Sequence, residues 1–340
     1  MIDLHTHLGG AVPAAVLWEI LCDSGLRTEF GSFDELQSYL SVKPGEIQSL
    51  DDFVGRYFHA SEFIQSSPGA ASTAVYQMVA KAYRRAKIDA VEIRFNPIKR
   101  IRGGLHSIDA IVLAAIQGLQ RASMHYDVRT GIIFSMGREL SIEENWQIID
   151  TALRFGRRRE MQGAYGLVGI DLAGPESRRN EANPDWLKET SRMVEKARNA
   201  DFGITWHVGE TTATGPELML KAIDSLRPDR IGHGIELRNA TGTQRDRIVQ
   251  QLREQQICLE ICPSVNLVTR SVGDLKEIAE VIHLCARESI PFCLNTDNPY
   301  LIHTNLAREY SLMEAELGTD APILEEAHRH AEQASFLKDR

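Results

Sequence analysis

Short apolar runs alternate along the chain with longer stretches in which apolar residues recur at helical spacing. Eight runs are short and rich in β-branched residues, as buried strands are: residues 1–4, 89–95, 130–136, 166–172, 202–208, 229–234, 257–262 and 291–296. The stretches between them place apolar residues three or four positions apart, which is typical of amphipathic helices. Strands that alternate with helices and read as continuous apolar runs form parallel sheets with helices outside. Eight such units predict an α/β fold, the (β/α)₈ TIM barrel.

The connection between the first two predicted strands is longer than one crossover helix requires. Residues from about 11 to 85 contain helix-like pieces at 13–25, 33–40, 50–64 and 71–87. So long a connection inside a compact barrel usually has a function. We therefore expect a helical insertion after strand one that acts as a lid over the barrel mouth. No repeat, low-complexity tract or linker interrupts residues 1–340, so we expect a single domain.

The composition of the chain limits the kinds of binding partner to be expected. The 340 residues are 43% hydrophobic and 25% charged, with a formal net charge of -9. A protein that binds nucleic acid in bulk needs a basic surface, so nucleic acid and anionic membrane surfaces are not expected partners. No signal-peptide pattern opens the chain, and no apolar run reaches the ~18 residues of a membrane span. The five cysteines show no disulfide or zinc-knuckle spacing, so a cytoplasmic location is expected, and homo-oligomer formation stays open.

Residues able to bind metal or exchange protons follow several of the predicted strands. They are His5 and His7 after strand one, Asp171 and Gly174 after strand four, His207 and Glu210 after strand five, His233 after strand six, and Asp297 and Asn298 after strand eight. In (β/α)₈ barrels the catalytic residues gather at the carboxyl ends of the strands. The pattern therefore predicts a functional site at that end of the barrel.

Three histidines and one aspartate of this group form a candidate metal site. His5 and His7 are two positions apart on a strand, so both imidazoles face the barrel interior. With His207 and Asp297 they supply three nitrogens and one oxygen, a set that suits zinc with a position left for water. Calcium and magnesium prefer oxygen ligands. Taken singly, each could be a packed histidine or a turn aspartate, but their convergence favours a metal.

Glu210 and His233 are candidate proton-exchanging groups beside the metal. Glu210 follows Gly209, where the chain is expected to turn, and could alternatively be an acid at a helix N-terminus. His233 lies between Gly232 and Gly234. Glycines permit close backbone approach, so we expect this imidazole to be left exposed.

The motifs LHTHLGG, VEIRFNP, VGIDLAGPE, HVGE, RIGHG, EICPSVNL and LNTDNP occur in this order between residues 4 and 299. Together they resemble the adenosine deaminase family of zinc-dependent purine aminohydrolases, within the amidohydrolase superfamily. The paired-cysteine signature of the other zinc deaminases is absent from the sequence. The resemblance implies hydrolytic deamination of an adenine-containing nucleoside, adenosine or a 5′-modified adenosine, to the 6-oxopurine and ammonia.

The resemblance also implies roles for single residues. His5, His7, His207 and Asp297 would bind one Zn²⁺, which makes water nucleophilic toward C6, and His7 would also border the substrate. His233 would orient that water and share its proton with Asp297. Glu210 would face N1 and must be protonated to donate, so a raised pKa is expected. The backbone N–H of Gly174 would contact N3.

Two departures from the family pattern concern the 5′ side of the substrate. Gly9 stands where members that act on adenosine usually have an acid that binds the 5′-hydroxyl. Basic residues occur in two nearby loops: Lys99, Arg100 and Arg102 in one, and Arg178 and Arg179 in the other. They are either solvated basic loops or a site for an anionic 5′ group. The second reading brings in aminodeoxyfutalosine deaminases, which resemble this family, and deaminases of adenine, N6-modified AMP or 5′-thioadenosines.

A third departure is Asn298, since the family usually has a second acid that faces N7 at this position. N7 is a bare acceptor, and an amide can donate to it at any pH, whereas a carboxyl must be protonated. We therefore expect Asn298 to contact N7 without adding a negative charge beside Asp297.

Two other classes of function stay open. One is a family member that binds nucleoside without catalysis, although such a protein needs no proton donor beside a metal. The other is a two-metal hydrolase, but strand four offers no lysine to bridge two ions.

Overall fold

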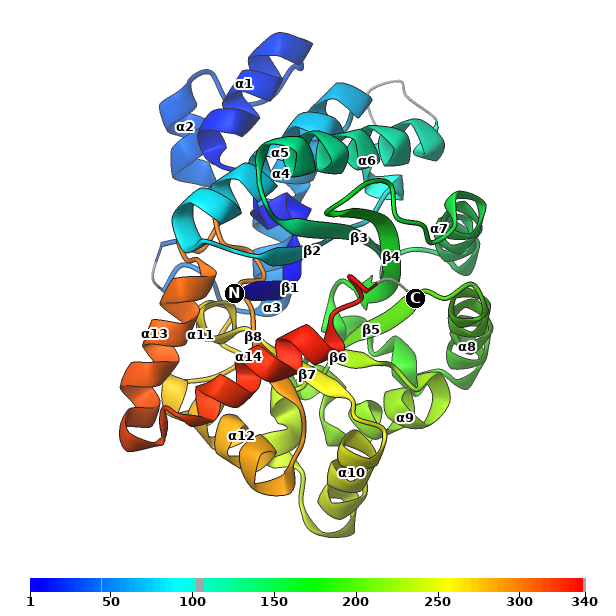
Figure 1. Ribbon diagram of the computed structural model, residues 1–340, viewed down its shortest axis with the longest axis vertical. Coiled ribbons are helices and arrows are strands. Elements are labelled where there is room, and N and C mark those ends of the chain that lie inside the picture. The colour runs from blue at the N-terminus through cyan, green and yellow to red at the C-terminus, as the bar shows by residue number, and fades with distance from the viewer. Residues whose placement is uncertain (44, 102–106, 339–340) are drawn as a thin grey trace.

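In the computed structural model, residues 1–43, 45–101 and 107–338 are described (Figure 1). Within these ranges eight parallel strands pair in sequence order, β1 through β8. Their bounds are β1 Ile2–His7, β2 Ala90–Phe95, β3 Arg129–Gly137, β4 Ala164–Ala173, β5 Gly203–Val208, β6 Arg230–His233, β7 Cys258–Ile261 and β8 Phe292–Leu294. A parallel bridge between Thr6 and Asp297, with two backbone hydrogen bonds of 2.8 Å, joins the last strand to the first. The predicted (β/α)₈ barrel is confirmed.

Helices surround the strands, as Figure 1 shows. They are α5 Pro68–Ala86, α6 Ile108–His125, α7 Ile142–Phe155, α8 Pro184–Asn199, α9 Pro216–Leu226, α10 Gly242–Glu254, α11 Pro263–Val268, α12 Leu275–Glu288, α13 Leu306–Leu317 and α14 Ile323–Ala334. Several begin at a side chain that caps the first turn; Ser141, for example, forms a capping box with Glu144 at the start of α7. In the described part of the chain, no helix has the length and apolar character needed to cross a membrane.

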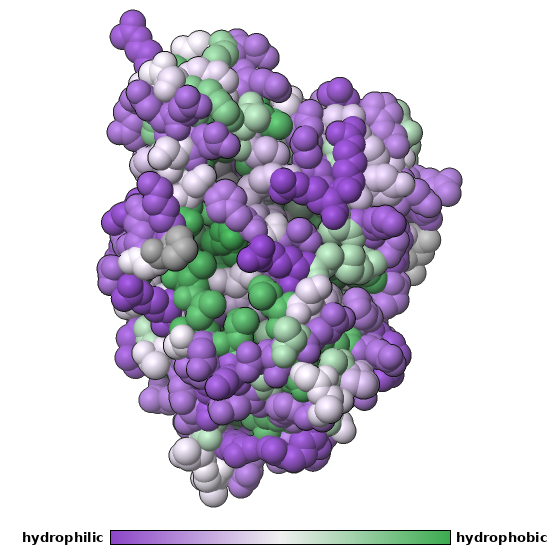
Figure 2. Space-filling model, turned by 90° about the vertical axis from the view of Figure 1, so that its left-hand side faces the viewer, coloured by the Kyte–Doolittle hydropathy of each residue, from purple (hydrophilic) through white to green (hydrophobic). Residues whose placement is uncertain are grey.

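The segment between β1 and β2 is helical, as predicted. It contains α1 Ala14–Ser24, α2 Phe33–Tyr39, α3 Leu50–Phe53, the π-helical turn η2 Val54–Phe58 and α4 His59–Ile64 before the crossover helix α5. Figure 2 views the side of the molecule that carries α1, α2 and α13 in Figure 1, and hydrophobic side chains gather there in a hollow within a mostly hydrophilic face. The α3–η2–α4 run matters most for function, because its side chains reach the pocket described below.

The barrel interior is charged rather than apolar over much of its length. Glu92, Arg94, Asp171, Arg230 and Glu260 project inward from four strands, β2, β4, β6 and β7, and each is 0% exposed. Buried charges are tolerated only when they are paired and hydrogen-bonded. These five pair with one another at 2.6–3.4 Å, which forms a continuous ionic layer beneath the carboxyl ends of the strands.

Candidate active site

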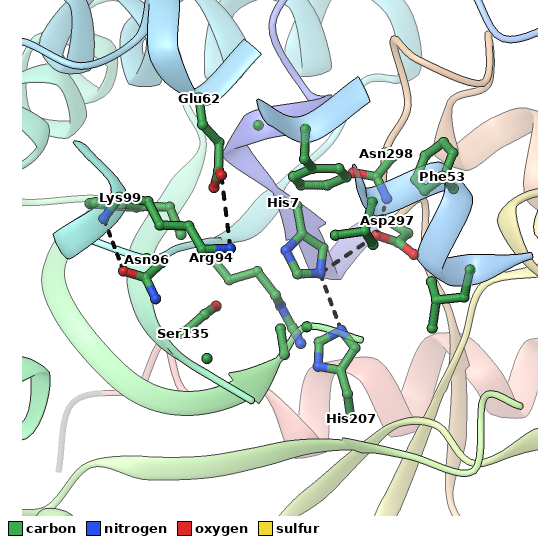
Figure 3. A pocket seen from close by; sticks show the side chains of 18 of the residues that line it. His7, Phe53, Glu62, Arg94, Asn96, Lys99, Ser135, His207, Asp297 and Asn298 are labelled. Carbon is green, nitrogen blue, oxygen red and sulfur yellow. Dashed lines mark hydrogen bonds and ion pairs between the residues drawn. The ribbon is translucent and has the colours of Figure 1, made fainter. Parts of the chain in front are cut away.

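Four predicted metal ligands converge at the carboxyl end of the barrel, and Figure 3 shows three of them, His7, His207 and Asp297. His5 and His7 come from β1, His207 from β5, and Asp297 from the turn after β8. His7 Nε2 lies 3.1 Å from His207 Nε2 and 3.6 Å from Asp297 Oδ1, and His5 Nε2 lies 3.9 Å from Asp297 Oδ1. Such spacings fit ligands that share one ion at about 2 Å from each donor atom.

Carboxylates fix the orientation of two imidazoles by binding the ring nitrogen that faces away from the predicted ion. His5 Nδ1 donates to Glu260 Oε2 at 2.8 Å, and His207 Nδ1 donates to Asp171 Oδ1 at 2.9 Å. Metal-binding histidines usually have such a partner, which leaves Nε2 free to bind the ion. Among the described residues, His5 Nε2 is buried and has no hydrogen-bond partner, as expected for an atom that faces a cation.

The charge states of the site also suit a divalent cation. Burial lowers the pKa of His5 and of His7 well below the usual range, so both imidazoles are neutral and can bind metal. Burial alone would raise the pKa of Asp171, but His207 and Arg94 lower it to about 2, so it stays charged. Burial raises the pKa of Asp297 to about 7, so a cation beside it would hold it in the charged form.

Two further side chains that could bind metal, His233 and Cys262, lie close to the four predicted ligands. The ligand atoms of His5, His207 and His233 are within 4.8 Å of one another, as are those of His5, Cys262 and Asp297. Burial raises the pKa of the Cys262 thiol well above its usual value, so Cys262 is a neutral thiol and a poor ligand. His233 is held between two carboxylates instead, with Nε2 3.5 Å from Glu210 Oε2 and 3.8 Å from Asp297 Oδ2.

The expectation that glycines leave His233 exposed is wrong, because His233 is only 1% exposed. Gly232 serves another purpose: a Cβ there would lie 3.1 Å from both the His5 and the His207 rings. Glycine at 232 therefore makes room for the two imidazoles. Asn266 Nδ2 lies 3.1 Å from His233 Nδ1, an arrangement in which the amide donates and the ring proton sits on Nε2, facing Glu210 and Asp297.

His233 and Asp297 both have left-handed backbones, with φ of 64° and 58°. A non-glycine residue in this region costs about 1–2 kcal/mol relative to the ordinary helical region. Strain of this kind tends to gather where side chains must be aimed at a site. Both residues turn out of their strands at the point where their side chains enter the pocket.

Glu210 has the raised pKa that was predicted. It is 3% exposed; burial raises its pKa well above the usual value, and the neighbouring charges of Glu176 and Asp297 add to the effect. Glu176 also holds the Glu210 loop, because its carboxylate accepts from Glu210 N at 3.2 Å and from Thr211 N at 2.7 Å. The surroundings of Glu210 therefore favour the protonated form of its carboxyl group.

Gly174 lines the same pocket at the end of β4. Its φ is 103°, a left-handed conformation that favours glycine, and a Cβ there would displace the end of the Glu139 side chain. Arg138 donates to Gly174 O at 3.3 Å, to His207 O, and to Glu181 at 2.6 Å. One buried guanidinium thus ties the Gly174 loop to the strand that carries a metal ligand.

Asn298 follows Asp297 and also lines the pocket. Its Nδ2 donates to Asp297 Oδ1 at 2.5 Å, and in the described structure its Oδ1 has no partner. One amide proton is therefore held by the metal-ligand carboxylate, and the second is available to another acceptor.

The end of the pocket away from the metal mixes charged and apolar side chains. In Figure 3, Glu62 and Lys99 face the cavity from the side opposite Asp297 and Asn298. Lys99 Nζ lies 2.5 Å from Glu139 Oε1 and 3.9 Å from Glu62 Oε2, and Arg100, which is 1% exposed, lies 3.9 Å from Glu62. The pocket, including its open mouth, encloses about 710 Å³ of empty space.

These positions decide between the two readings of the basic loops. Lys99 and Arg100 line the pocket, so the reading as a solvated loop is wrong for them. Arg178 and Arg179 are exposed and do not line it, so they are a solvated pair. Arg102 lies outside the described residues.

Sequence reasoning assigned no role to Glu62, Arg138, Glu176 or Glu260, and none to Asp171 as the partner of His207. The available signal was the presence of charges inside otherwise apolar strands, as in VEIRF and CLEI. A charge at an inward-facing strand position needs a partner on another strand, although the sequence does not say which one.

A (β/α)₈ barrel with histidines and an aspartate gathered at its strand ends is an arrangement that suits a metal-dependent hydrolase. The family model described as adenosine deaminase matches residues 1–340, and the chain belongs to that family. An adenosine deaminase of Clostridium perfringens is 26% identical over 99% of this chain and 94% of its own length. The chain is accordingly a hydrolase that acts on the C6 amino group of a purine.

Two solved structures share the fold. An adenine deaminase from Arthrobacter aurescens superimposes with a TM-score of 0.82 at 20% identity, covering 99% of this chain and 94% of that one. The N6-mAMP deaminase of Arabidopsis gives a TM-score of 0.76 at 24% identity, over 99% and 93% of the two chains. Both likenesses show a shared fold. Deamination of an adenine compound follows from membership of the family.

Proposed function

We propose that the protein is a zinc-dependent enzyme that hydrolyses the C6 amino group of an adenine nucleoside, giving the 6-oxopurine and ammonia. One observation carries the proposal: Glu210, a buried carboxyl group with a raised pKa, lines the same pocket as His7, His207 and Asp297. A module that only bound nucleosides would have no use for a proton donor at this position.

The donor set fits zinc in number and type, with the imidazoles of His5, His7 and His207 and the carboxylate of Asp297. When bound, the ion would supply the positive charge that makes water nucleophilic near neutral pH. The Nε2 proton of His233 is placed to hold the attacking water, and Asp297 Oδ2, 3.8 Å away, is placed to accept its proton.

Glu210 is proposed to donate its proton to N1 as a C6–O bond forms. Protonation of N1 lets the ring accommodate the electrons displaced from the C6–N1 double bond. The proton that Asp297 took from water then passes to the amino group, the C6–N bond breaks and ammonia leaves. The hydroxyl proton at C6 returns to Glu210, which leaves the 6-oxo group and restores both carboxyl groups. Only the protonated form of Glu210 can protonate N1, and burial favours that form.

Gly174 and Asn298 are proposed to recognise the purine ring. The backbone N–H of Gly174 would donate to N3, while Arg138 holds the carbonyl of the same residue. The second amide proton of Asn298 would donate to N7. Asn298 thus has a double role, since its first proton remains on Asp297.

The 5′ side of the nucleoside is proposed to lie at Glu62 and Lys99. A side chain at position 9 would meet the Phe58 ring at 3.0 Å, with Glu62 Cγ 3.6 Å away, so Glu62 from α4 occupies the region that an acid at position 9 would reach. The Glu62 carboxylate can accept a hydrogen bond from a 5′ substituent. Leu50, Phe53, Val54 and Phe58 add an apolar wall, which leaves room for a group larger than a hydroxyl.

A second candidate substrate is an adenosine whose 5′ substituent joins an apolar group to a carboxylate, as aminodeoxyfutalosine does. The observation in its favour is that the apolar wall and the two cations Lys99 and Arg100 line the same pocket. Against a strongly anionic group such as a phosphate, both cations already lie beside carboxylates, Glu62 and Glu139.

Loss of adenine absorbance and release of ammonia, measured over a panel of substrates, test the proposal. The panel contains adenosine, adenine, N6-methyl-AMP, 5′-methylthioadenosine and aminodeoxyfutalosine, with the zinc content of the enzyme determined in parallel. We expect the highest kcat/KM with a 5′-modified nucleoside. A clear preference for unmodified adenosine would refute the 5′ assignment, and no ammonia from any compound would refute the function.

A further inference from the structure

The C-terminal residues Ser335–Leu337 close the amino end of the barrel. Phe336 and Leu337 are 3% and 1% exposed, and their side chains enter the barrel where β3, β4 and β5 each carry a glycine. A Cβ at Gly203 would lie 2.3 Å from the Phe336 ring, and one at Gly131 would lie 2.6 Å from Leu337. The strands are thus shaped to receive this segment, which we call the C-terminal plug.

The plug makes polar as well as apolar contacts. Phe336 N and Ser335 Oγ donate to Glu92 Oε1 at 2.6 and 2.9 Å, and Arg230 donates to Ala334 O at 2.9 Å. The Arg230 guanidinium also lies 3.7 Å from the centroid of the Phe336 ring, a cation–π contact in a site without solvent. A segment that served only to exclude water could do so with apolar contacts alone.

These contacts continue upward to a metal ligand through buried groups. Glu92 Oε2 accepts from Arg230 at 2.6 Å, Arg230 Nε donates to Glu260 Oε1 at 2.6 Å, and Glu260 Oε2 accepts from His5 at 2.8 Å. Arg94 and Thr205 supply the remaining donors to Glu260, at 2.9 and 3.0 Å. Each hydrogen bond restricts the orientation of the next carboxylate or guanidinium, because a buried charge that loses its partner costs free energy.

We propose that the C-terminal plug is a positioning element of the metal centre. Through Glu92, Arg230 and Glu260 it fixes the orientation of the His5 imidazole and keeps its proton on Nδ1. None of the plug residues touches the substrate pocket, so the effect is indirect. The inference rests on the proposed zinc site and concerns zinc affinity rather than the choice of substrate.

We call the contacts from Glu92 through Arg230 and Glu260 to His5 the relay. Its role is tested by the zinc dissociation constants of variants, measured by competition with a chelator of known affinity at a temperature where every variant is folded. Glu92→Gln is the main variant, since an amide can satisfy either the plug or Arg230 but not both. Phe336→Ala removes the cation–π contact and the packing. Leu337→Ala is the matched control, because it removes packing from the same plug and leaves the polar relay intact.

Substitution of a direct partner of a metal-binding histidine weakens metal binding about 10- to 100-fold. Glu92 and Phe336 are further from the ion, so we expect Glu92→Gln and Phe336→Ala to weaken zinc binding about three- to tenfold. Leu337→Ala should lower Tm but keep zinc affinity within about twofold of wild type, as expected for a loss of packing alone. Equal zinc affinities in all four proteins, or an equal loss in Leu337→Ala, would overturn the relay. If Phe336→Ala does not fold, the comparison of Glu92→Gln with Leu337→Ala decides. Failure of the wild type to bind zinc would instead refute the zinc site itself.

Discussion

The two ends of the pocket are built differently. At the end with the predicted metal ligands, which we call the metal end, His5, His207 and Glu210 are each held by a buried carboxylate. The carboxylates of Glu260 and Asp171 come from β7 and β4, and that of Glu176 comes from the turn after β4. At the other end, Lys99 is 22% exposed and lies between Glu62 from the insertion and Glu139 from the loop after β3. The metal end is thus rigid and defined by the barrel, whereas the far end depends on how the insertion packs over it.

This difference assigns chemistry to one end and selectivity to the other. Groups that react must be held by locked neighbours to act efficiently. Groups that distinguish substituents can come from loops and insertions, which vary without disturbing the barrel. Changes at the metal end should therefore lower turnover for every substrate, and changes at the far end should reorder substrates.

The largest effect is expected for Glu210→Gln. General acid catalysis contributes about 10²- to 10⁴-fold, and an amide cannot transfer the proton, so kcat/KM should fall by that factor for every substrate. Zinc affinity should not change. Glu62→Gln is the matched carboxamide substitution at the far end, and steady-state kinetics should show a much smaller loss for it. Equal losses in the two variants would remove the distinction between the ends.

The second effect concerns the carboxylates behind the metal ligands. Glu260→Gln and Asp171→Asn should each weaken zinc binding by about 10- to 100-fold, because His5 and His207 lose the partner that fixes the ring. Chelator competition measures the change. Ser264→Ala, whose side chain is not part of this layer, is a control that should bind zinc as the wild type does.

A pH profile tests the state of Glu210. Because its pKa is raised and only its protonated form donates, kcat/KM should fall as pH rises through that pKa, about tenfold per pH unit. Glu210→Gln should lack this alkaline limb. A wild-type profile in which activity instead rises through the same range would contradict a protonated Glu210.

At the far end, Glu62→Gln should change selectivity. A hydrogen bond to a charged group contributes about 1.5–3 kcal/mol, so a nucleoside that donates to Glu62 from its 5′ side should lose about tenfold or more in kcat/KM. Adenine, which has no 5′ group, should be affected least. A uniform loss over the whole panel would show that Glu62 acts on structure rather than on the substituent.

The smallest change is expected for Asn298→Asp. A second carboxylate would stand where Nδ2 now lies 2.5 Å from Asp297 Oδ1, and two such acids couple so that one titrates higher. Zinc should be retained while the pH–rate profile shifts. An unchanged profile, together with equal discrimination against a 7-deaza substrate, would show that Asn298 does not contact N7.

The same difference explains what the sequence could predict. The barrel and the convergence of His5, His7, His207 and Asp297 follow from strand periodicity, because parallel strands bring their carboxyl ends to one edge. The partners Glu260 and Asp171 could not be paired with their histidines, since that pairing depends on which strands face each other across the closed barrel. Glu62 lies in a helix of the insertion, and no local pattern places that helix over Gly9.

The expectation that His233 is exposed failed for a related reason. A glycine in a sequence indicates that space is needed, but not which atoms need it. At Gly232 the atoms are two imidazoles from other strands, and the histidine beside it is buried.

Ammonia release from adenine nucleosides by enzyme of measured zinc content tests the central claim most directly. The proposed mechanism predicts one zinc per chain and one ammonia for each 6-oxopurine formed, with activity lost when zinc is removed and regained when it is returned. A protein that binds zinc and nucleoside but releases no ammonia from any adenine compound would contradict it.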